Sequence, residues 1–487
     1  MKLLTTLLLL VAIHVNAQVV AIEKLNSDLQ KTNSGWLAKD NWLNHLSTAE
    51  LKRMMGARNV NPSPVEFSTD ISTQGAEIFD WRDQKGVNFV SPILNQGNCG
   101  SCVAFATIGT LETQMNIATG LAFLNNHYSP EALFACGGGG CAEGWMPGSA
   151  VQYLQATGVP DEACAPYTMG ATGNDVSCSS ICKDAASRSQ KISTFSSPSS
   201  MTDVKNALKK GPLITTLYVY ADFISYSSGV YKHRTGGPLG GHAVSLIGFD
   251  DTKNAWIIRN SWGPDWGING FGYVSYDDTS GVGQDNEALQ VTASSEQLYT
   301  DLRDRAFVSG NTQFKVQSTF KSAQPITVSI IDENTKALKG INCTGTDCAL
   351  SVSTADLADG KYEFVATSGS EQLHRYFYVS NHSEKINLAV KAENFTAQAP
   401  VSDRIVIDVT LSSDGKVPLQ QIALVYQDST GTVKERWTDS VADQMSIGWR
   451  TNMVPNGAYK VWIRARTFAS GQVQTIDSTA WNLNIQN

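Results

Sequence analysis

The sequence lacks three features that would each have pointed to a class of protein. After residue 17 it has no apolar run of the roughly 20 residues that a helix needs to cross a bilayer. Its 37 lysines and arginines are outnumbered by 45 acidic residues, which argues against a nucleic-acid binder. No second cysteine or histidine pair stands at zinc-finger spacing from Cys99 and Cys102. We therefore expect no membrane span, no nucleic-acid partner, no metal and no cofactor.

A short apolar stretch does stand at the N-terminus. Lys2 is followed by LLTTLLLLVAI and then HVNA, with small or neutral residues at Val15 and Ala17. This pattern predicts a signal peptide over residues 1–17, and it is too short for an anchor helix. We expect a secreted or lysosomal protein, and three N-glycosylation sequons agree with that route. The sequons are at Asn342, Asn381 and Asn394.

Nine cysteines in an oxidising compartment leave at least one thiol unpaired within the chain. The stretch NQGNCGSCVAFA holds Cys99 and Cys102, and Cys102 begins an apolar helix that we expect over residues 102–119. A thiol at a helix N-terminus feels the helix dipole and unpaired N–H groups, which favour the nucleophilic thiolate. Spacing alone leaves two interpretations open, because Cys102 is either the free thiol or half of a disulfide.

The region before the compact part of the chain is polar. In residues 18–76, STAELKRMMG predicts a helix with Ser47 as N-cap, Glu50 closing a capping box and Gly56 as the stop. The following NPSPVEFSTDISTQG is typical of an extended linker.

Two further regions follow. Helix and strand patterns alternate over residues 77–293. From 294 onward short alternating strands are separated by Gly, Asp and Asn turns, which predicts two β-sandwiches, 294–392 and 393–487.

A second chemical feature lies in GGHAVSLIGFDDTKNAWIIRNSWG. If its two strands pair as a hairpin centred near Asp251, His242 and Asn260 are directly opposed, with β-carbons about 5 Å apart. The asparagine carbonyl then accepts from one imidazole nitrogen and leaves the other to face a thiol, as covalent catalysis requires. Trp262 lies on the same strand face, where its indole would shield the His–Asn bond from water.

These segments carry a family resemblance. QGNCGSCVAFA, GGHAVSLIGF and IIRNSWG resemble the three catalytic segments of papain-like cysteine proteases, and FDWRD, KKGPL, YADFISYSSGVY and WGINGFGYV extend the match over about 77–280. The resemblance implies an α+β papain-like two-lobe fold, with a helical left lobe and a β-barrel-like right lobe. We expect two all-β, immunoglobulin-like sandwich domains to follow it.

The resemblance also assigns roles. It implies Cys102 as nucleophile, His242 as acid/base, Asn260 as its orienter and Gln96 as an oxyanion-hole donor, so that peptide bonds are hydrolysed through a thioester. Gly144 and Trp262 are the implied substrate-binding residues.

The chain departs from the family pattern at two positions. Val103 stands where the family usually has tryptophan, and Glu143 stands where it usually has glycine. Either Glu143 puts charge near the cleft or, as we favour, it is a solvated loop residue. The tandem histidines of the cathepsin B occluding loop are absent, so we expect an endopeptidase.

With Cys102 free, the remaining eight cysteines form pairs that the resemblance suggests but the sequence alone does not fix. The implied disulfides are Cys99–Cys141, Cys136–Cys178, Cys164–Cys182 and a local Cys343–Cys348.

Residues 18–76 then resemble a short propeptide of the cathepsin B type. We expect this propeptide to act as the protein's own inhibitor, with Trp36, Trp42 and the short helix packed on the enzyme while the linker covers the cleft. Processing would fall near Gly75–Ile78.

Four tryptophans crowd the end of the chain. Such residues more often fill a sandwich core than form a sugar-binding platform. We expect attachment or substrate targeting through a carbohydrate or surface ligand of these domains. The residues are Trp437, Trp449, Trp462 and Trp481.

Two other functions compete with a zymogen of an endopeptidase. One is a non-catalytic papain-shaped binding or adhesion protein, against which the intact set of catalytic residue types argues. The other is a disulfide exchange protein that uses Cys99 and Cys102, which predicts a reversible bridge between them and leaves His242 and Asn260 without a role.

Overall fold

A computed structural model describes residues 22–60, 76–119, 127–291 and most of 298–486. The last range has gaps at 301, 303–305, 319, 321–323, 333–335, 382–385, 397–398, 403, 414–420, 439–443, 452–453 and 470–471. The expected signal peptide and the expected linker over 61–75 lie outside the described residues.

The N-terminal segment, which we define as residues 22–60, is more structured than its polar composition indicates. It contains α1 (Ile22–Lys31), β1 (Trp36–Ala38), the 3-10 helix η1 (Trp42–His45) and α2 (Thr48–Met54). The predicted cap of α2 is confirmed, because the Ser47 hydroxyl accepts from the Glu50 N–H and the Glu50 carboxylate accepts from the Ser47 N–H. Strand β1 was not expected, and it pairs antiparallel with β5 (Tyr226–Tyr231) of the main sheet.

The region over residues 76–291 places its longest helix at the centre. Its helices are α3 (Cys102–Thr119), α4 (Pro130–Gly137), α5 (Pro147–Ala156), α6 (Met169–Thr172) and α7 (Met201–Leu208), with 3-10 turns η2 (Cys178–Ser180), η3 (Ala185–Arg188) and η4 (Phe223–Ser225). The bounds of α3 are those that the sequence predicts. Because α3 packs against α4, α5 and the sheet, nearly all of its first four turns are buried.

One sheet carries the other half of this region. Its strands, besides β1 and β5, are β2 (Ile78–Asp80), β3 (Thr194–Ser196), β4 (Leu213–Tyr220), β6 (Pro238–Asp250), β7 (Ala255–Arg259), β8 (Phe271–Ser275) and β9 (Asn286–Gln290). They run in the order β1-β5-β8-β7-β6-β4-β9-β3, with β2 paired to β6. One apolar cluster joins this sheet to the N-terminal segment, and a second surrounds α3.

The predicted register of the β6–β7 hairpin is wrong. Asp250 pairs with Ala255 across a four-residue turn, and a bulge between Leu246 and Gly248 shifts the register once more. His242 and Asn260 are therefore not directly opposed, and β7 ends at Arg259. Their side chains meet diagonally instead, which long side chains on one sheet face can do.

The four disulfides of the structure are those that the family resemblance implies. They are Cys99–Cys141, Cys136–Cys178, Cys164–Cys182 and Cys343–Cys348, and Cys102 is the free cysteine. Because Cys99 is paired with Cys141, the bridge that a disulfide exchange protein needs between Cys99 and Cys102 is not formed.

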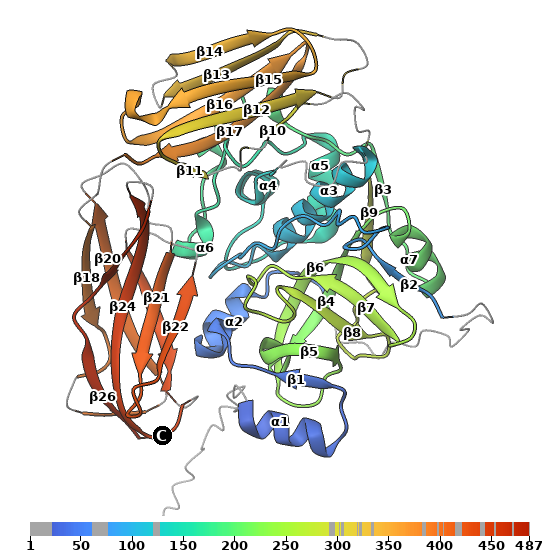
Figure 1. Ribbon diagram of the computed structural model, residues 1–487. Helices are drawn as coiled ribbons and strands as arrows, with labels where there is room; N and C mark the ends of the chain where they lie inside the picture. Colours follow the sequence, from blue (N-terminus) through green and yellow to red (C-terminus); the bar gives the residue numbers. More distant parts are fainter. Residues whose placement is uncertain are drawn as a thin grey trace, which may run out of the picture.

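The first sandwich packs two sheets around one apolar core (Figure 1). Sheet β10-β12-β15 faces sheet β11-β17-β16-β13-β14. The elements are β10 (Leu298–Thr300), β11 (Ala306–Val308), β12 (Asn311–Ser318), β13 (Ile326–Asp332), β14 (Ala337–Cys343), β15 (Asp347–Ser353), η5 (Thr354–Asp356), β16 (Gly360–Ser368) and β17 (Glu371–Val379). An ion pair joins it to the region over residues 76–291, where Arg188 lies 3.1 Å from Glu363.

The second sandwich is built in the same way around its own core. Sheet β18-β20-β23 faces sheet β19-β26-β24-β21-β22, with β25 paired to β24. The strands are β18 (Ile386–Ala392), β19 (Pro400–Val401), β20 (Arg404–Ser413), β21 (Gln421–Gln427), β22 (Val433–Thr438), β23 (Gln444–Arg450), β24 (Gly457–Ala469), β25 (Gln472–Asp477) and β26 (Trp481–Ile485). The expected boundary at 392/393 is too late, because β18 pairs with β20 and thus belongs to this second domain.

The tryptophans of the second sandwich divide between core and surface. Trp449 is fully buried and stacks on Tyr426, as the core interpretation expects. Trp462 and Trp481 are only half-buried, and the side chain of Trp437 lies outside the described residues.

Candidate active site

The free thiol of Cys102 lies at the first residue of α3 and is fully buried. Burial raises its pKa to about 11, because desolvation disfavours the thiolate. Backbone N–H groups near the sulfur, those of Ala243, Gly56 and Val103, partly oppose this rise in pKa. Ala243 follows His242 on β6, so the thiol lies next to the strand that carries the imidazole.

The imidazole of His242 is held between an amide and an indole. Its Nε2 lies 2.8 Å from Oδ1 of Asn260, and this oxygen also accepts the Ser261 N–H at 2.8 Å. An amide oxygen only accepts, so the neutral ring carries its proton on Nε2 and its lone pair on Nδ1. Trp262 stacks on the ring with centroids 4.5 Å apart.

The second imidazole nitrogen of His242 is the one that we expect from the sequence to face the thiol. Nδ1 of His242 is buried and has no hydrogen-bond partner among the described residues. Burial lowers the pKa of His242 to about 4, and the bond to Asn260 only partly opposes this. In this covered state both groups therefore favour their neutral forms, the thiol of Cys102 and the uncharged imidazole of His242.

The amide of Gln96 is oriented by several bonds. Its Oε1 accepts from the Ser261 hydroxyl at 2.8 Å, which fixes the orientation of the amide. Nε2 donates to the carbonyl oxygens of Cys99 at 2.9 Å and Met54 at 3.0 Å. Met54 belongs to the N-terminal segment, so this donor is already occupied.

The N-terminal segment runs through the site directly after α2. Ala57 forms a parallel bridge to Trp145. The Trp145 N–H donates to the Gly56 carbonyl oxygen at 2.7 Å, and the Trp145 carbonyl oxygen accepts from the Arg58 N–H at 3.0 Å. On the other side the Ala57 N–H donates to Gly241 O at 3.0 Å. Residues 54–58 of the N-terminal segment therefore lie against the site. The linker that was expected to cover the cleft lies outside the described residues.

Glycines permit this close passage. A β-carbon on Gly56 would lie 1.8 Å from the Gly100 carbonyl oxygen, and one on Gly144 would lie 2.1 Å from the Gly56 oxygen. Gly144 also has a φ of 69°, which residues with a side chain rarely adopt. Gly144, the expected substrate-binding residue, therefore lies against the backbone of the N-terminal segment.

Comparisons with known proteins agree with this geometry. The chain matches the family model described as "Papain family cysteine protease" over residues 75–295. The curated relative "Cathepsin B-like CP3" of Giardia intestinalis is 32% identical over 278 residues, which cover 54% of this chain and 92% of that protein. The chain belongs to the papain family of cysteine proteases.

Further similar proteins carry related names. "Cathepsin B-like CP2" of Giardia intestinalis is 36% identical over 204 residues, which cover 40% of this chain and 67% of that protein. The solved structure of "proCathepsin B S9 from Trypanosoma congolense" is 24% identical, with a TM-score of 0.48, and the match covers 56% of this chain and 98% of that one.

The two departures of this papain-family protease from the expected pattern lie in different surroundings. Val103 is fully buried in the first turn of α3. Glu143 is exposed, and its backbone oxygen accepts from the Arg58 side chain at 2.6 Å. Glu143 is thus a solvated loop residue, as favoured from the sequence.

Sequence reasoning missed Tyr167. Its hydroxyl donates to the backbone oxygen of Gln96 at 2.7 Å and lies 2.7 Å from the hydroxyl of Ser101, the residue before the nucleophile. The ring packs edge-on against Phe105 of α3. Tyr167 thus ties the Gln96 loop to the start of α3, and its distance of 66 residues from Ser101 leaves no local signal in the sequence.

Proposed function

We propose that this papain-family protease is a secreted or lysosomal endopeptidase that is made as a zymogen. The observation that carries the proposal is the pairing of His242 with Asn260 at 2.8 Å, which leaves Nδ1 without a hydrogen-bond partner among the described residues. The next residue on the strand, Ala243, lies near the free thiol of Cys102. An imidazole fixed in this tautomer is poised to take a proton on Nδ1.

The proposed reaction begins with proton transfer from the Cys102 thiol to Nδ1 of His242. The sulfur attacks the peptide carbonyl, and the oxyanion accepts bonds from the Gln96 amide and the Cys102 N–H. The imidazolium then gives its proton to the leaving amine as the C–N bond breaks, which leaves a thioester. Water attacks the thioester carbonyl while His242 takes its proton, the C–S bond breaks and the carboxylic acid product leaves. The imidazolium then returns a proton to the sulfur, which restores the thiol.

The N-terminal segment is the proposed inhibitor. Met54 occupies the Gln96 donor, and Gly56 covers Cys102, so a substrate carbonyl has no access to either. Burial also removes the thiolate–imidazolium pair, because it raises the pKa of Cys102 and lowers that of His242. Release of the segment would return water to both groups and allow the ion pair to form. We propose Gly144 and Trp262 as residues of the substrate cleft that this release opens.

A protease assay tests the proposal directly. The full chain is cut in the 61–75 linker, the N-terminal segment is removed, and peptide hydrolysis is measured with and without an epoxide thiol trap. We expect activity that the trap abolishes and that Cys102→Ser lacks. Hydrolysis that survives Cys102→Ser would reject Cys102 as the nucleophile, and an inert but folded mature protein would favour a papain-shaped binding protein.

Entry into the secretory pathway is part of the proposal. No helix among the described residues is long and apolar enough to cross a membrane. The three sequons differ in geometry, since Nδ2 of Asn381 donates to both Thr354 O and Leu357 O, whereas Nδ2 of Asn394 donates once, to Arg404 O. A glycosylated amide keeps one N–H only, so we propose Asn342 and Asn394 rather than Asn381 as the glycan sites.

A further inference from the structure

The second sandwich contacts the N-terminal segment through an ion pair. Nη2 of Arg404, the first residue of β20, lies 2.7 Å from Oε2 and 2.8 Å from Oε1 of Glu50 on α2. The two side chains are only 22% and 27% exposed. Strand β23 of the same sheet also contacts η1 and α6, so the sheet β18-β20-β23 faces the segment and the protease together.

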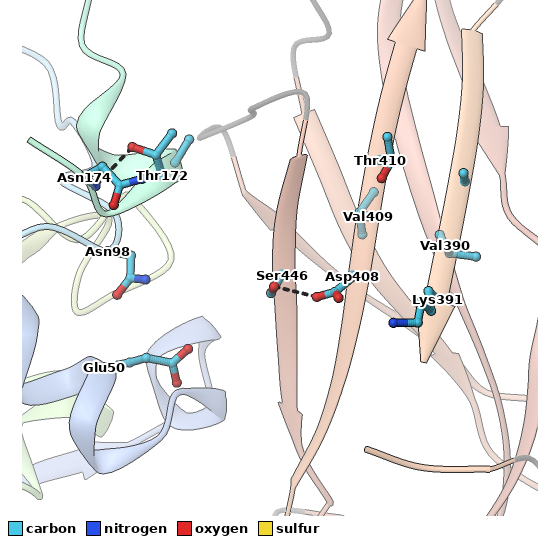
Figure 2. Close-up of a pocket in the computed structure, with 12 residues that line it drawn as sticks. Glu50, Asn98, Thr172, Asn174, Val390, Lys391, Asp408, Val409, Thr410 and Ser446 are labelled. Carbon is cyan, nitrogen blue, oxygen red and sulfur yellow. Dashed lines mark hydrogen bonds between the residues drawn. The ribbon is translucent and has the colours of Figure 1, made fainter. Parts of the chain in front are cut away.

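This sheet face is polar where it meets the protease. Along β20 the residues that alternate with Arg404 point into the sandwich core, such as Ile405 and Ile407. Asp408 and Thr410 share the face of Arg404, and Figure 2 shows them across a cleft from Glu50. The cleft has a volume of about 600 Å³. The ion pair of Glu50 and Arg404 bridges the two surfaces beside this cleft.

Glu50 connects the ion pair with Arg404 to the active site through α2. It is the third residue of α2, and its carboxylate also accepts the Ser47 N–H at 2.7 Å. One turn later Met54 accepts from Gln96, and two residues further Gly56 covers Cys102. An ion pair at Glu50 therefore restrains α2, whose C-terminal residue Met54 occupies the amide of Gln96.

We propose that the sheet β18-β20-β23 is a docking surface for this chain's own N-terminal segment, and that Arg404 clamps the segment on the active site through Glu50. The proposal rests on the inhibitory role given to the segment above. The second sandwich thereby gains a regulatory role, because it slows opening of the zymogen. Once the segment has left, Arg404 loses its partner.

Gly448 supports the clamp. It lies on β23 beside Arg404, and a β-carbon there would lie 2.3 Å from Nη2 of Arg404. The guanidinium thus crosses the space that a side chain would fill. Gly448→Ala would displace Arg404 from Glu50 without removing either charge.

The clamp is tested on the uncut full chain by the rate at which iodoacetamide labels Cys102. The other eight cysteines are in disulfides, so the rate reports opening of the segment. Arg404→Gln and Glu50→Gln should each speed labelling about two- to fivefold, the range for a partly exposed ion pair. Glutamine at position 50 keeps the capping box. Gly448→Ala should raise the rate in the same direction.

The double variant and a matched control complete the design. Arg404→Gln with Glu50→Gln should label no faster than either single variant, since both remove one interaction. Arg464→Gln, which breaks an intradomain pair to Asp477 in the same sandwich, should leave the rate unchanged. Slow labelling of the wild type with no change in Arg404→Gln would overturn the clamp alone. Fast labelling of the wild-type chain would overturn the inhibitory role on which the clamp rests.

Discussion

Replacing Gly56 by alanine tests whether the N-terminal segment inhibits by close backbone fit. The new β-carbon would lie 1.8 Å from the Gly100 oxygen and 2.3 Å from its carbonyl carbon. Both are backbone atoms of the loop before Cys102, so neither can move aside by a rotamer change. The segment or the nucleophile loop must therefore shift.

The magnitude follows from the cost of overpacking. One extra methyl group in a close-packed site costs about 1–3 kcal/mol. At about 1.4 kcal/mol per tenfold, this weakens binding of the segment about 5- to 150-fold.

The assay is inhibition of the mature protease by a peptide of residues 22–60. The Gly56→Ala peptide should raise the inhibition constant by that factor. A Lys52→Ala peptide is the control, because Lys52 is exposed on α2 and alanine favours the helix. Equal inhibition by the wild-type and Gly56→Ala peptides would show that the segment does not lie against Gly100 as described.

Three further predictions concern pH, the oxyanion hole and glycosylation. Burial lowers the pKa of His242 from 6.5 to about 4 in the covered site. Removal of the N-terminal segment should let this pKa rise toward 6.5, so the uncovered site takes up a proton first as pH falls. The affinity of the 22–60 peptide for the Cys102→Ser protease should therefore fall from pH 7 to pH 4, by at most about 100-fold, and a flat titration would contradict this. Tyr167→Phe should lower kcat about tenfold with KM little changed, because the Gln96 loop loses its tie to α3; a change in KM alone would refute this. Asn342→Gln should remove one glycan from the secreted chain on a gel, whereas Asn381→Gln should remove none.

Local sequence signals predicted the elements that carry the site. The apolar run from Cys102 predicted α3 to its last residue, and the Ser47–Glu50 capping box was found where its spacing places it. Both depend on interactions within a few residues, which explains why sequence alone suffices.

Features set by long-range packing were missed. The His242–Asn260 contact was expected from a register that the four-residue turn and the Leu246–Gly248 bulge overturn, and nothing local marks a bulge there. Strand β1 pairs with β5, where Trp36 lies opposite Gly229, a residue far along the chain. The alternation of apolar and polar residues in β18 is typical of a strand but does not indicate which sheet the strand joins. The boundary between the two sandwiches was therefore expected too late in the chain.

The rate of Cys102 alkylation at pH 6, before and after removal of the N-terminal segment, tests the central claim most directly. We predict a rise of about 100-fold or more on removal, with fast labelling already at pH 6, because the exposed thiol then forms an ion pair with His242. Equal rates before and after removal would contradict the claim. So would a released thiol that reacts only as pH approaches about 8.5, the pKa of an ordinary cysteine.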